Sequence, residues 1–298
     1  MQQNLKLGTL LIIISTFAYA VLGAIVKSHD MQMSPPQMLF IQNMVALLLV
    51  TPLVLAKGKL QRDAIIHSPY KIMQFFRAFF SLAIGYFFYY ALQTISLGTG
   101  VLLLNTSPLI VPFIALIFLR KPIQHRLWLP MLIGFVGVTL ILHPNGEDFT
   151  IGSWLALGGA ISMGCSILLG RRLAEKGQTS FTNLFYYFFY ATILSGIIAI
   201  FFWKPVANNI MWIIVLSGII WFIVQYTLVL AMNYIEAQIL LTLYYLNIVF
   251  AVILTIIFWH TIPSWLTWLG MVLIILGGIV TIQVQHRINQ QNKRLNMV

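Results

Sequence analysis

Residues 98–119 read GTGVLLLNTSPLIVPFIALIFL, and this stretch contains no charged side chain. A helix needs about 20 mainly apolar residues to cross the hydrocarbon of a bilayer, so the stretch is long enough to span a membrane. Of the 298 residues of the chain, 60% are hydrophobic and only 8% are charged, whereas soluble domains carry roughly 25% charged residues. A soluble fold has no way to bury that much apolar surface. The sequence therefore predicts an integral membrane protein whose partner is the lipid bilayer.

Nine similar apolar segments lie before and after this stretch. Together they predict ten transmembrane helices, at Leu7–Lys27, Gln37–Ala56, Gln74–Thr94, Gly98–Leu119, Leu127–His143, Ile151–Gly170, Phe181–Trp203, Met211–Ala231, Ala237–Trp259 and Ile262–Gln283. The first segment lacks a clear small-residue cleavage site and precedes nine more spans, so we expect it to be retained. No loop is long enough for a soluble domain, and the predicted fold class is an all-α membrane protein.

Lysine and arginine are distributed unevenly over the predicted loops. With the N-terminus inside, fourteen of the 17 basic residues fall on the cytoplasmic side, whereas Lys27 and Lys204 fall outside and Arg77 lies within a span. Because basic loops stay in the cytoplasm, we expect a multi-pass protein of the cell (inner) membrane with both termini cytoplasmic. We interpret the net charge of +11 as this topology signal. The basic residues form no groove interleaved with aromatics, so no nucleic acid partner is expected.

The second half of the chain repeats features of the first half. A shift of 140 residues places Ala91 on Ala231, Trp128 on Trp268 and Gly137 on Gly277 without gaps. Such constant spacing indicates an internal duplication, with a first five-helix repeat at 1–143, a second at 150–285 and a cytoplasmic basic tail at 286–298. Because five is odd, the second repeat must enter the membrane from the opposite side. Inverted repeats of this kind place the substrate site of a transporter near the midplane.

Four short motifs follow one another between residues 90 and 137. They are an Ala-Leu pair at the end of the third helix, a proline within the fourth, a short charged turn and a glycine-bearing fifth helix, in Tyr90-Ala91-Leu92-Gln93, Asn105-Thr106-Ser107-Pro108, Phe118-Leu119-Arg120-Lys121-Pro122 and Gly134 to Gly137. In this order they resemble the EamA-type transporters of the drug/metabolite transporter superfamily. The resemblance implies a central cavity lined mainly by the first, third, fourth, sixth, eighth and ninth helices, and transport by alternating access.

Polar side chains near the middle of the predicted helices are candidates for a substrate site, because such groups are costly in hydrocarbon unless they face a cavity or a partner. The candidates for substrate binding are Tyr19, Tyr86, Asn105, Ser107, Trp221, Gln225, Tyr226, Tyr245 and Asn247. Three pairs among them are related by the shift of 140, namely Tyr86 with Tyr226, Asn105 with Tyr245 and Ser107 with Asn247. An aromatic and amide lining suits a zwitterionic or heteroaromatic metabolite. The alternative interpretation is that these groups hydrogen-bond neighbouring helices.

Arg77 lies about one turn inside the third predicted helix. One interpretation is that its long side chain extends to the cytoplasmic interface. The other is that it attracts an anionic substrate group at the inner mouth of the transporter.

Glycines recur in the last helix of each predicted repeat, at Gly134, Gly137, Gly270, Gly277 and Gly278. Small residues allow transmembrane helices to approach closely. We expect these glycines to form contacts within the chain, and a homodimer interface is the alternative.

Several kinds of chemistry find no support in the sequence. GxSxG, HExxH and paired intramembrane aspartates are absent, so no catalytic residues and no enzyme are predicted. The single cysteine, Cys165, excludes a cysteine-based metal cage, and no metal or cofactor is expected. All acidic residues and histidines lie in loops or at helix ends, which favours facilitated transport or exchange over a proton relay.

The predicted function is therefore secondary transport of a small organic metabolite, such as an amino acid or a derivative. A membrane channel, or an intramembrane enzyme without a recognisable motif, is the alternative.

Overall fold

The computed structural model describes residues 4–28, 34–58, 65, 67–95, 97–119, 125–142, 150–205, 211–260 and 263–295. Its helices are α1 (Leu5–Ser28), α2 (Pro35–Leu55), α4 (Lys71–Ala91), α5 (Leu97–Leu104), α6 (Ser107–Leu119), the 3-10 turn η1 (His125–Leu127), α7 (Trp128–Leu142), α8 (Ile151–Glu175), α9 (Ser180–Phe201), α10 (Met211–Ala231), α11 (Ala237–Tyr244), α12 (Leu246–Trp259) and α13 (Trp265–Leu295). Within the described ranges, ten spans are long and apolar enough to cross a membrane. The all-α membrane fold predicted from the sequence is confirmed.

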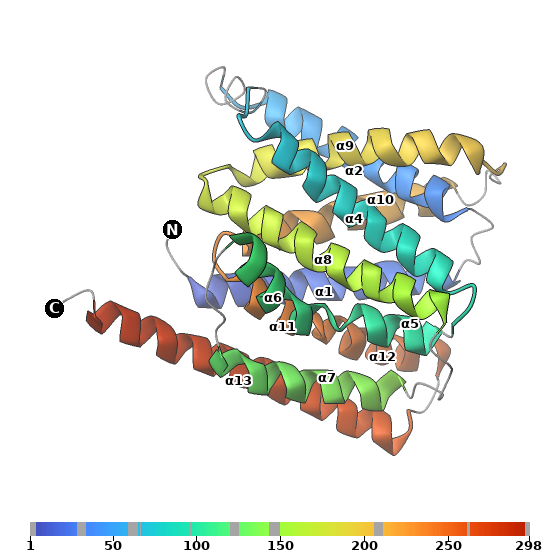
Figure 1. Ribbon diagram of the computed structural model, residues 1–298. Helices are drawn as coiled ribbons and strands as arrows, with labels where there is room; N and C mark the ends of the chain where they lie inside the picture. The colour runs from blue at the N-terminus through green and yellow to red at the C-terminus, as the bar shows by residue number, and fades with distance from the viewer. Residues whose placement is uncertain are drawn as a thin grey trace.

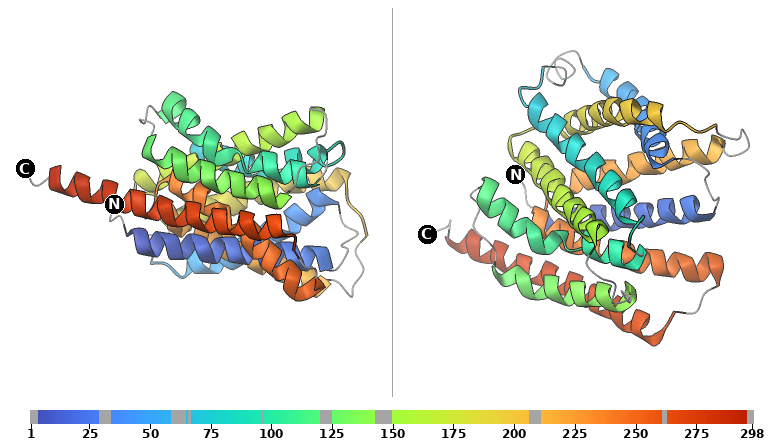
Figure 2. Two further views of the ribbon diagram at one scale, coloured as in Figure 1. Left: turned by 90° about the horizontal axis from the view of Figure 1, so that it is seen from below. Right: turned by 45° about the vertical axis from the view of Figure 1, so that its right-hand side comes forward.

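The outer surface of the bundle is apolar. Ile117, Ile200 and Trp265 are each more than two thirds exposed, as expected for side chains that face lipid rather than water. The helices lie roughly side by side, and both chain ends lie on the left in Figure 1. Figure 2 shows that the C-terminal part of α13 extends beyond the rest of the bundle.

The fourth and ninth spans are each built from two helices. The fourth breaks between α5 and α6 at Asn105 and Thr106, and the ninth breaks between α11 and α12 at Tyr245. Pro108 explains the first break, because proline has no amide hydrogen to donate to the carbonyl of Leu104. The second break contains no proline, yet it lies at the position equivalent to Asn105 under the shift of 140.

Helices from the two halves of the chain pack against each other in pairs. The closest associations are α4 with α8, α1 with α10, α2 with α9, and α7 with α13. Under the predicted duplication, α4 corresponds to α10 and α8 to α1, so the first two associations are equivalent. Helices α1 and α8 run in opposite directions in Figure 1.

The contact between α7 and α13 depends on glycine. A Cβ atom on Gly137 would lie 2.6 Å from the carbonyl oxygen of Gly270, and a Cβ on Gly270 would lie 2.5 Å from the oxygen of Gly137. A Cβ on Gly277 would lie 3.0 Å from the amide nitrogen of Gly134. The prediction that these glycines form contacts within the chain is confirmed.

The half-helix α11 is buried from Ala237 to Leu243, where it meets α1, α6, α8 and α13. Its polar side chains are hydrogen-bonded. Gln238 Nε2 donates to Met131 Sδ of α7 at 3.0 Å, and Thr242 Oγ1 donates to the Gln238 carbonyl at 2.9 Å. The main apolar core gathers around Ile239 and Leu240 in this half-helix. The part of the ninth span that precedes the break at Tyr245 is therefore packed in the protein core.

Candidate functional site

A cavity of about 540 Å³ lies inside the helical bundle. Small-molecule sites typically have volumes of roughly 300–1,000 Å³, so the cavity is large enough for a metabolite. The first, third, fourth, sixth, eighth and ninth spans line it, as the family resemblance implied. The second and seventh spans also contribute, through Asn43 of α2 and Tyr187 of α9.

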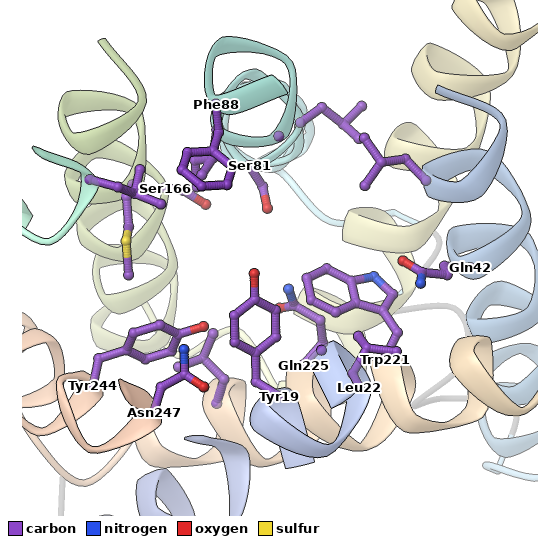
Figure 3. A pocket seen from close by; sticks show the side chains of 18 of the residues that line it. Tyr19, Leu22, Gln42, Ser81, Phe88, Ser166, Trp221, Gln225, Tyr244 and Asn247 are labelled. Atoms are coloured by element: carbon purple, nitrogen blue, oxygen red, sulfur yellow. The ribbon is translucent and has the colours of Figure 1, made fainter. Parts of the chain in front are cut away.

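One side of the cavity is a row of three aromatic rings. The Tyr19 ring centroid lies 6.2 Å from that of Trp221 and 6.0 Å from that of Tyr244, with tilted planes in both pairs. These separations fall within the favourable range for aromatic pairs. Trp221 is held in place because its Nε1 donates to Asn43 Oδ1 at 3.1 Å. Figure 3 shows Tyr19 extending into the cavity between the other two rings. We call Trp221, Tyr19 and Tyr244 the aromatic wall.

Asn247 lies beside Tyr244, on the side toward Tyr19 (Figure 3). Its Oδ1 atom is buried and has no hydrogen-bond donor within the described part of the chain. A buried acceptor without a partner costs roughly 1–3 kcal/mol, so a ligand that donates to this oxygen would recover that free energy. In Asn105 the Nδ2 atom donates back to the Val101 carbonyl at 2.8 Å, so this amide already uses its donor group within its own helix.

A polar cluster is centred on Tyr187. The Tyr187 hydroxyl lies 2.9 Å from Ser81 Oγ and accepts a hydrogen bond from Gln225 Nε2 at 3.1 Å. The Arg77 guanidinium lies over the Tyr187 ring, 4.9 Å from its centroid, an arrangement that attracts a cation to the face of the ring. Helices α4, α9 and α10 therefore meet at one hydroxyl group.

Arg77 does not extend to the membrane interface. Its residue exposure is 1%, and its Nη1 donates to the backbone carbonyl of Asn183 at 3.1 Å. The interpretation that the side chain reaches the cytoplasmic surface is therefore wrong. Its guanidinium is instead held against α9, by the Asn183 carbonyl and the face of the Tyr187 ring.

The structure divides the residues that were predicted to bind substrate. Those that line the cavity are Tyr19, Asn105, Trp221, Gln225 and Asn247, together with the predicted inner-mouth charge Arg77. Those that lie outside its lining are Tyr86, Ser107, Tyr226 and Tyr245. The repeat pairs are split as well, because Asn247 lines the cavity whereas its mate Ser107 donates to Met163 Sδ at 3.5 Å.

The three tyrosines outside the cavity lining pack between helices. The Tyr226 ring of α10 lies 6.3 Å from the Phe181 ring of α9, centroid to centroid. Tyr245 is 1% exposed, and its ring would be 2.7 Å from a Cβ on Gly134. Tyr86 packs against the apolar cluster between α2, α4 and α9, and its hydroxyl is buried. The hydroxyls of Tyr86 and Tyr245 have no hydrogen-bond partner within the described residues, so these side chains pack between helices without the hydrogen bonds that the alternative interpretation expected.

The cavity residues that were not among the predicted candidates include Asn43, Ser81, Tyr187 and Tyr244. Asn43 and Tyr187 are 144 residues apart, and a shift of 144 residues also places Gly8 on Gly152. A search for pairs of polar residues at this shift, in addition to the shift of 140, would have found Asn43 and Tyr187. Tyr187 is otherwise hidden, because it lies in the aromatic run FYYFFY at 185–190.

Comparison with known proteins places this geometry in context. The sequence model of the EamA-like transporter family matches residues 6–143 and again residues 150–283. The riboflavin transporter of Vibrio cholerae is 20% identical over 97% of both chains. The pseudopaline exporter CntI of Pseudomonas aeruginosa is 24% identical over 92% of this chain and 95% of that relative.

A third relative, the S-adenosylmethionine uptake transporter of Rickettsia conorii, is 24% identical over 62% of this chain and 63% of its own length. A solved crystal structure that is 18% identical superposes with a TM-score of 0.76, over 92% of this chain and 96% of that one. The structural likeness supports the fold.

Proposed function

This chain belongs to the EamA-like transporter family, and on that basis we propose that it is a secondary transporter that carries a small organic metabolite through the central cavity by alternating access. The observation that carries the proposal is the cavity itself, which both halves of the chain line. Tyr19 comes from the first half, whereas Trp221 and Asn247 come from the second. A site shared between two repeats can open to one side or the other as the repeats move.

An inverted repeat supports this mechanism. The family model matches each half separately, and the equivalent associations α4 with α8 and α10 with α1 both occur. The opposite directions of α1 and α8 agree with halves that are threaded in opposite senses (Figure 1). We propose repeats at 1–143 and 150–285, with both termini on the cytoplasmic side of the inner membrane.

The lining of the cavity suggests the chemistry of the solute. An aromatic wall with amide groups at its edges suits a planar or amphipathic body that also forms hydrogen bonds. The relatives named above carry riboflavin, pseudopaline and S-adenosylmethionine, which supports a small organic metabolite as the substrate. An amino acid or a derivative, expected from the sequence, belongs to the same range.

Exchange or facilitated transport is the mechanism that we favour. Among the described residues the carboxylates are Glu175, which ends α8, and Glu236, which precedes α11. Glu175 lies 3.4 Å from Arg171 Nε and 3.6 Å from Arg172 Nη1. A proton relay usually needs a titratable group within the membrane, and neither carboxylate is at mid-span.

Ligand-dependent thermal stabilisation of the purified protein tests the proposal. A panel of amino acids, nucleosides and vitamins should contain compounds that raise the melting temperature, because a ligand that binds the folded state stabilises it. Each such compound is then tested in proteoliposomes for counterflow. Uptake of labelled solute should accelerate when unlabelled solute is present on the far side. Uptake that is insensitive to solute on the far side would indicate a channel and refute the carrier.

A further inference from the structure

Arg77 is a buried cation that lines the cavity. Its guanidinium has five N–H groups, yet Nη1 to the Asn183 carbonyl is its one hydrogen bond in the described structure. The Nε atom is buried without an acceptor. An isolated charge in a low-dielectric interior is costly unless it is paired, so this site favours the arrival of a negative group.

Partial charges around Arg77 do not neutralise it. The Tyr187 ring and the Asn183 carbonyl attract the guanidinium but carry no net charge. No carboxylate among the residues with described positions lies within ion-pair distance of Arg77, and Glu175 is already paired with Arg171 and Arg172. The cavity therefore contains a full positive charge that no carboxylate of the described residues balances.

The Arg77 backbone and the residue that accepts its hydrogen bond are also held in place. Ser166 Oγ donates to the Arg77 backbone carbonyl at 3.1 Å, which joins α8 to α4 at this residue. Gln74 Nε2 donates to Asn183 Oδ1 at 2.5 Å, one turn before Arg77. A Cβ on Gly170 would lie 3.0 Å from Arg77 Nε, so glycine at this position leaves room for the guanidinium. A positioned arginine loses less conformational entropy on binding than a free one.

We propose that the transported solute carries an anionic group, a carboxylate or a phosphate, which pairs with Arg77 while its uncharged body lies along the aromatic wall. This inference rests on the proposed function and names its substrate class. A planar guanidinium matches the geometry of both kinds of anion with two parallel hydrogen bonds. Tyr187 is a positioning residue, because Ser81 and Gln225 hold its hydroxyl while its ring faces the guanidinium.

Matched pairs of probes test the charge requirement directly. Indole-3-acetate is compared with indole-3-acetamide, and adenosine 5′-monophosphate with adenosine, so that carboxylate and phosphate are separate arms. The readout is the melting temperature of the purified full-length protein near neutral pH. At least one anion should stabilise the wild-type protein, and its uncharged or amidated mate should not.

The variant R77Q assigns the effect to this residue. The concentration of anion that gives half-maximal stabilisation should rise by roughly tenfold to a hundredfold, the range expected for losing a charge-assisted hydrogen bond. R172Q is the matched control, because Arg172 is 40% exposed and lies outside the cavity lining; its response should equal that of the wild type. R77K retains the charge without the planar fork and should keep the preference for anions at reduced affinity.

Three results would overturn the inference: mates that stabilise as well as the anions, an unchanged response in R77Q, or a panel in which no anion stabilises the wild type. If R77Q fails to accumulate, R77K is the deciding variant. Loss of the preference for anions in R77K would refute the pairing with Arg77, and a retained preference would support it. Failure here differs from failure of the transport proposal. Suppose that neutral compounds bind wild type and R77Q equally well and show counterflow. The transport proposal would then stand, and the requirement for an anionic group would be refuted.

Discussion

Substitution of Gly137 by alanine should destabilise the protein by separating α7 from α13. The new Cβ would lie 2.6 Å from the Gly270 carbonyl oxygen, whereas ordinary contact begins at 3.4 Å, so the overlap is about 0.8 Å. The same atom would also lie 3.0 Å from the Ile274 amide nitrogen. Because both neighbours are backbone atoms, they cannot rotate away, and the helices themselves must move. Overpacking of this kind costs about 1–3 kcal/mol.

The free energy of unfolding in mixed micelles, titrated with a denaturing detergent, measures this cost. Gly23→Ala is the control, because it also adds a methyl group to a helical glycine but its Cβ would meet nothing within 4 Å. Alanine exceeds glycine in helix propensity by up to about 1 kcal/mol, so the control should be neutral or more stable than wild type. Gly137 does not line the cavity. Ligand affinity of the folded Gly137→Ala protein should therefore match that of the wild type.

Equal stability of Gly137→Ala and wild type would refute the close approach of α7 and α13. A loss of the same size in Gly23→Ala would refute it as well, because the effect would then not depend on the neighbours.

Three further predictions concern the cavity and the topology. Asn247→Ala should raise the half-saturation concentration for uptake by roughly threefold to twentyfold at unchanged membrane level, the range expected for one hydrogen bond in a membrane protein; unchanged kinetics would remove Asn247 from the site. Tyr187→Phe removes the hydroxyl that two side chains share but keeps the ring beside the guanidinium, so it should raise the half-saturation concentration about threefold and preserve the maximal rate; a collapse of the maximal rate would contradict a positioning role. In a Cys165→Ser background, an impermeant maleimide should label Lys204→Cys on intact cells and Lys176→Cys only in opened membranes; the reverse pattern would contradict the proposed orientation.

The spans could be predicted because the membrane fixes both their length and their composition. The eighth span was predicted at Met211–Ala231, and α10 has the same limits. Helix α13 instead continues from Trp265 to Leu295, beyond the predicted end at Gln283. Hydropathy detects where a helix leaves the hydrocarbon, not where its backbone hydrogen bonds end. The resemblance to EamA-type transporters, which came from short motifs, is confirmed by the family match over both halves.

The candidate site was harder to predict because these helices are apolar on nearly every side. Polarity alone identified Tyr19 and Asn247, which line the cavity, together with Tyr86 and Tyr226, which pack outside its lining. The direction in which each side chain points depends on the neighbouring helices, and a single sequence does not contain that information. Tyr187 is a cavity residue that polarity did not identify. The other five residues of 185–190 are also aromatic, and only the packing of the helices determines which of the six faces Arg77.

The proposed alternation places specific demands on the two ends of the bundle. A Cβ on Gly8, at the start of α1, would lie 2.5 Å from Ile235 Cγ2, and a Cβ on Gly152, at the start of α8, would lie 3.3 Å from Ile95 Cγ2. These contacts are equivalent under the predicted duplication and lie at opposite ends, because α1 and α8 run in opposite directions. In the proposed motion, α1 moves against α10 and opens one side of the cavity, while the contact between α8 and α4 stays intact. In the reverse motion the contact between α1 and α10 is restored and the contact between α8 and α4 separates. Glycine at both positions keeps each contact close without interlocking side chains, so either one can separate at a low cost in lost packing.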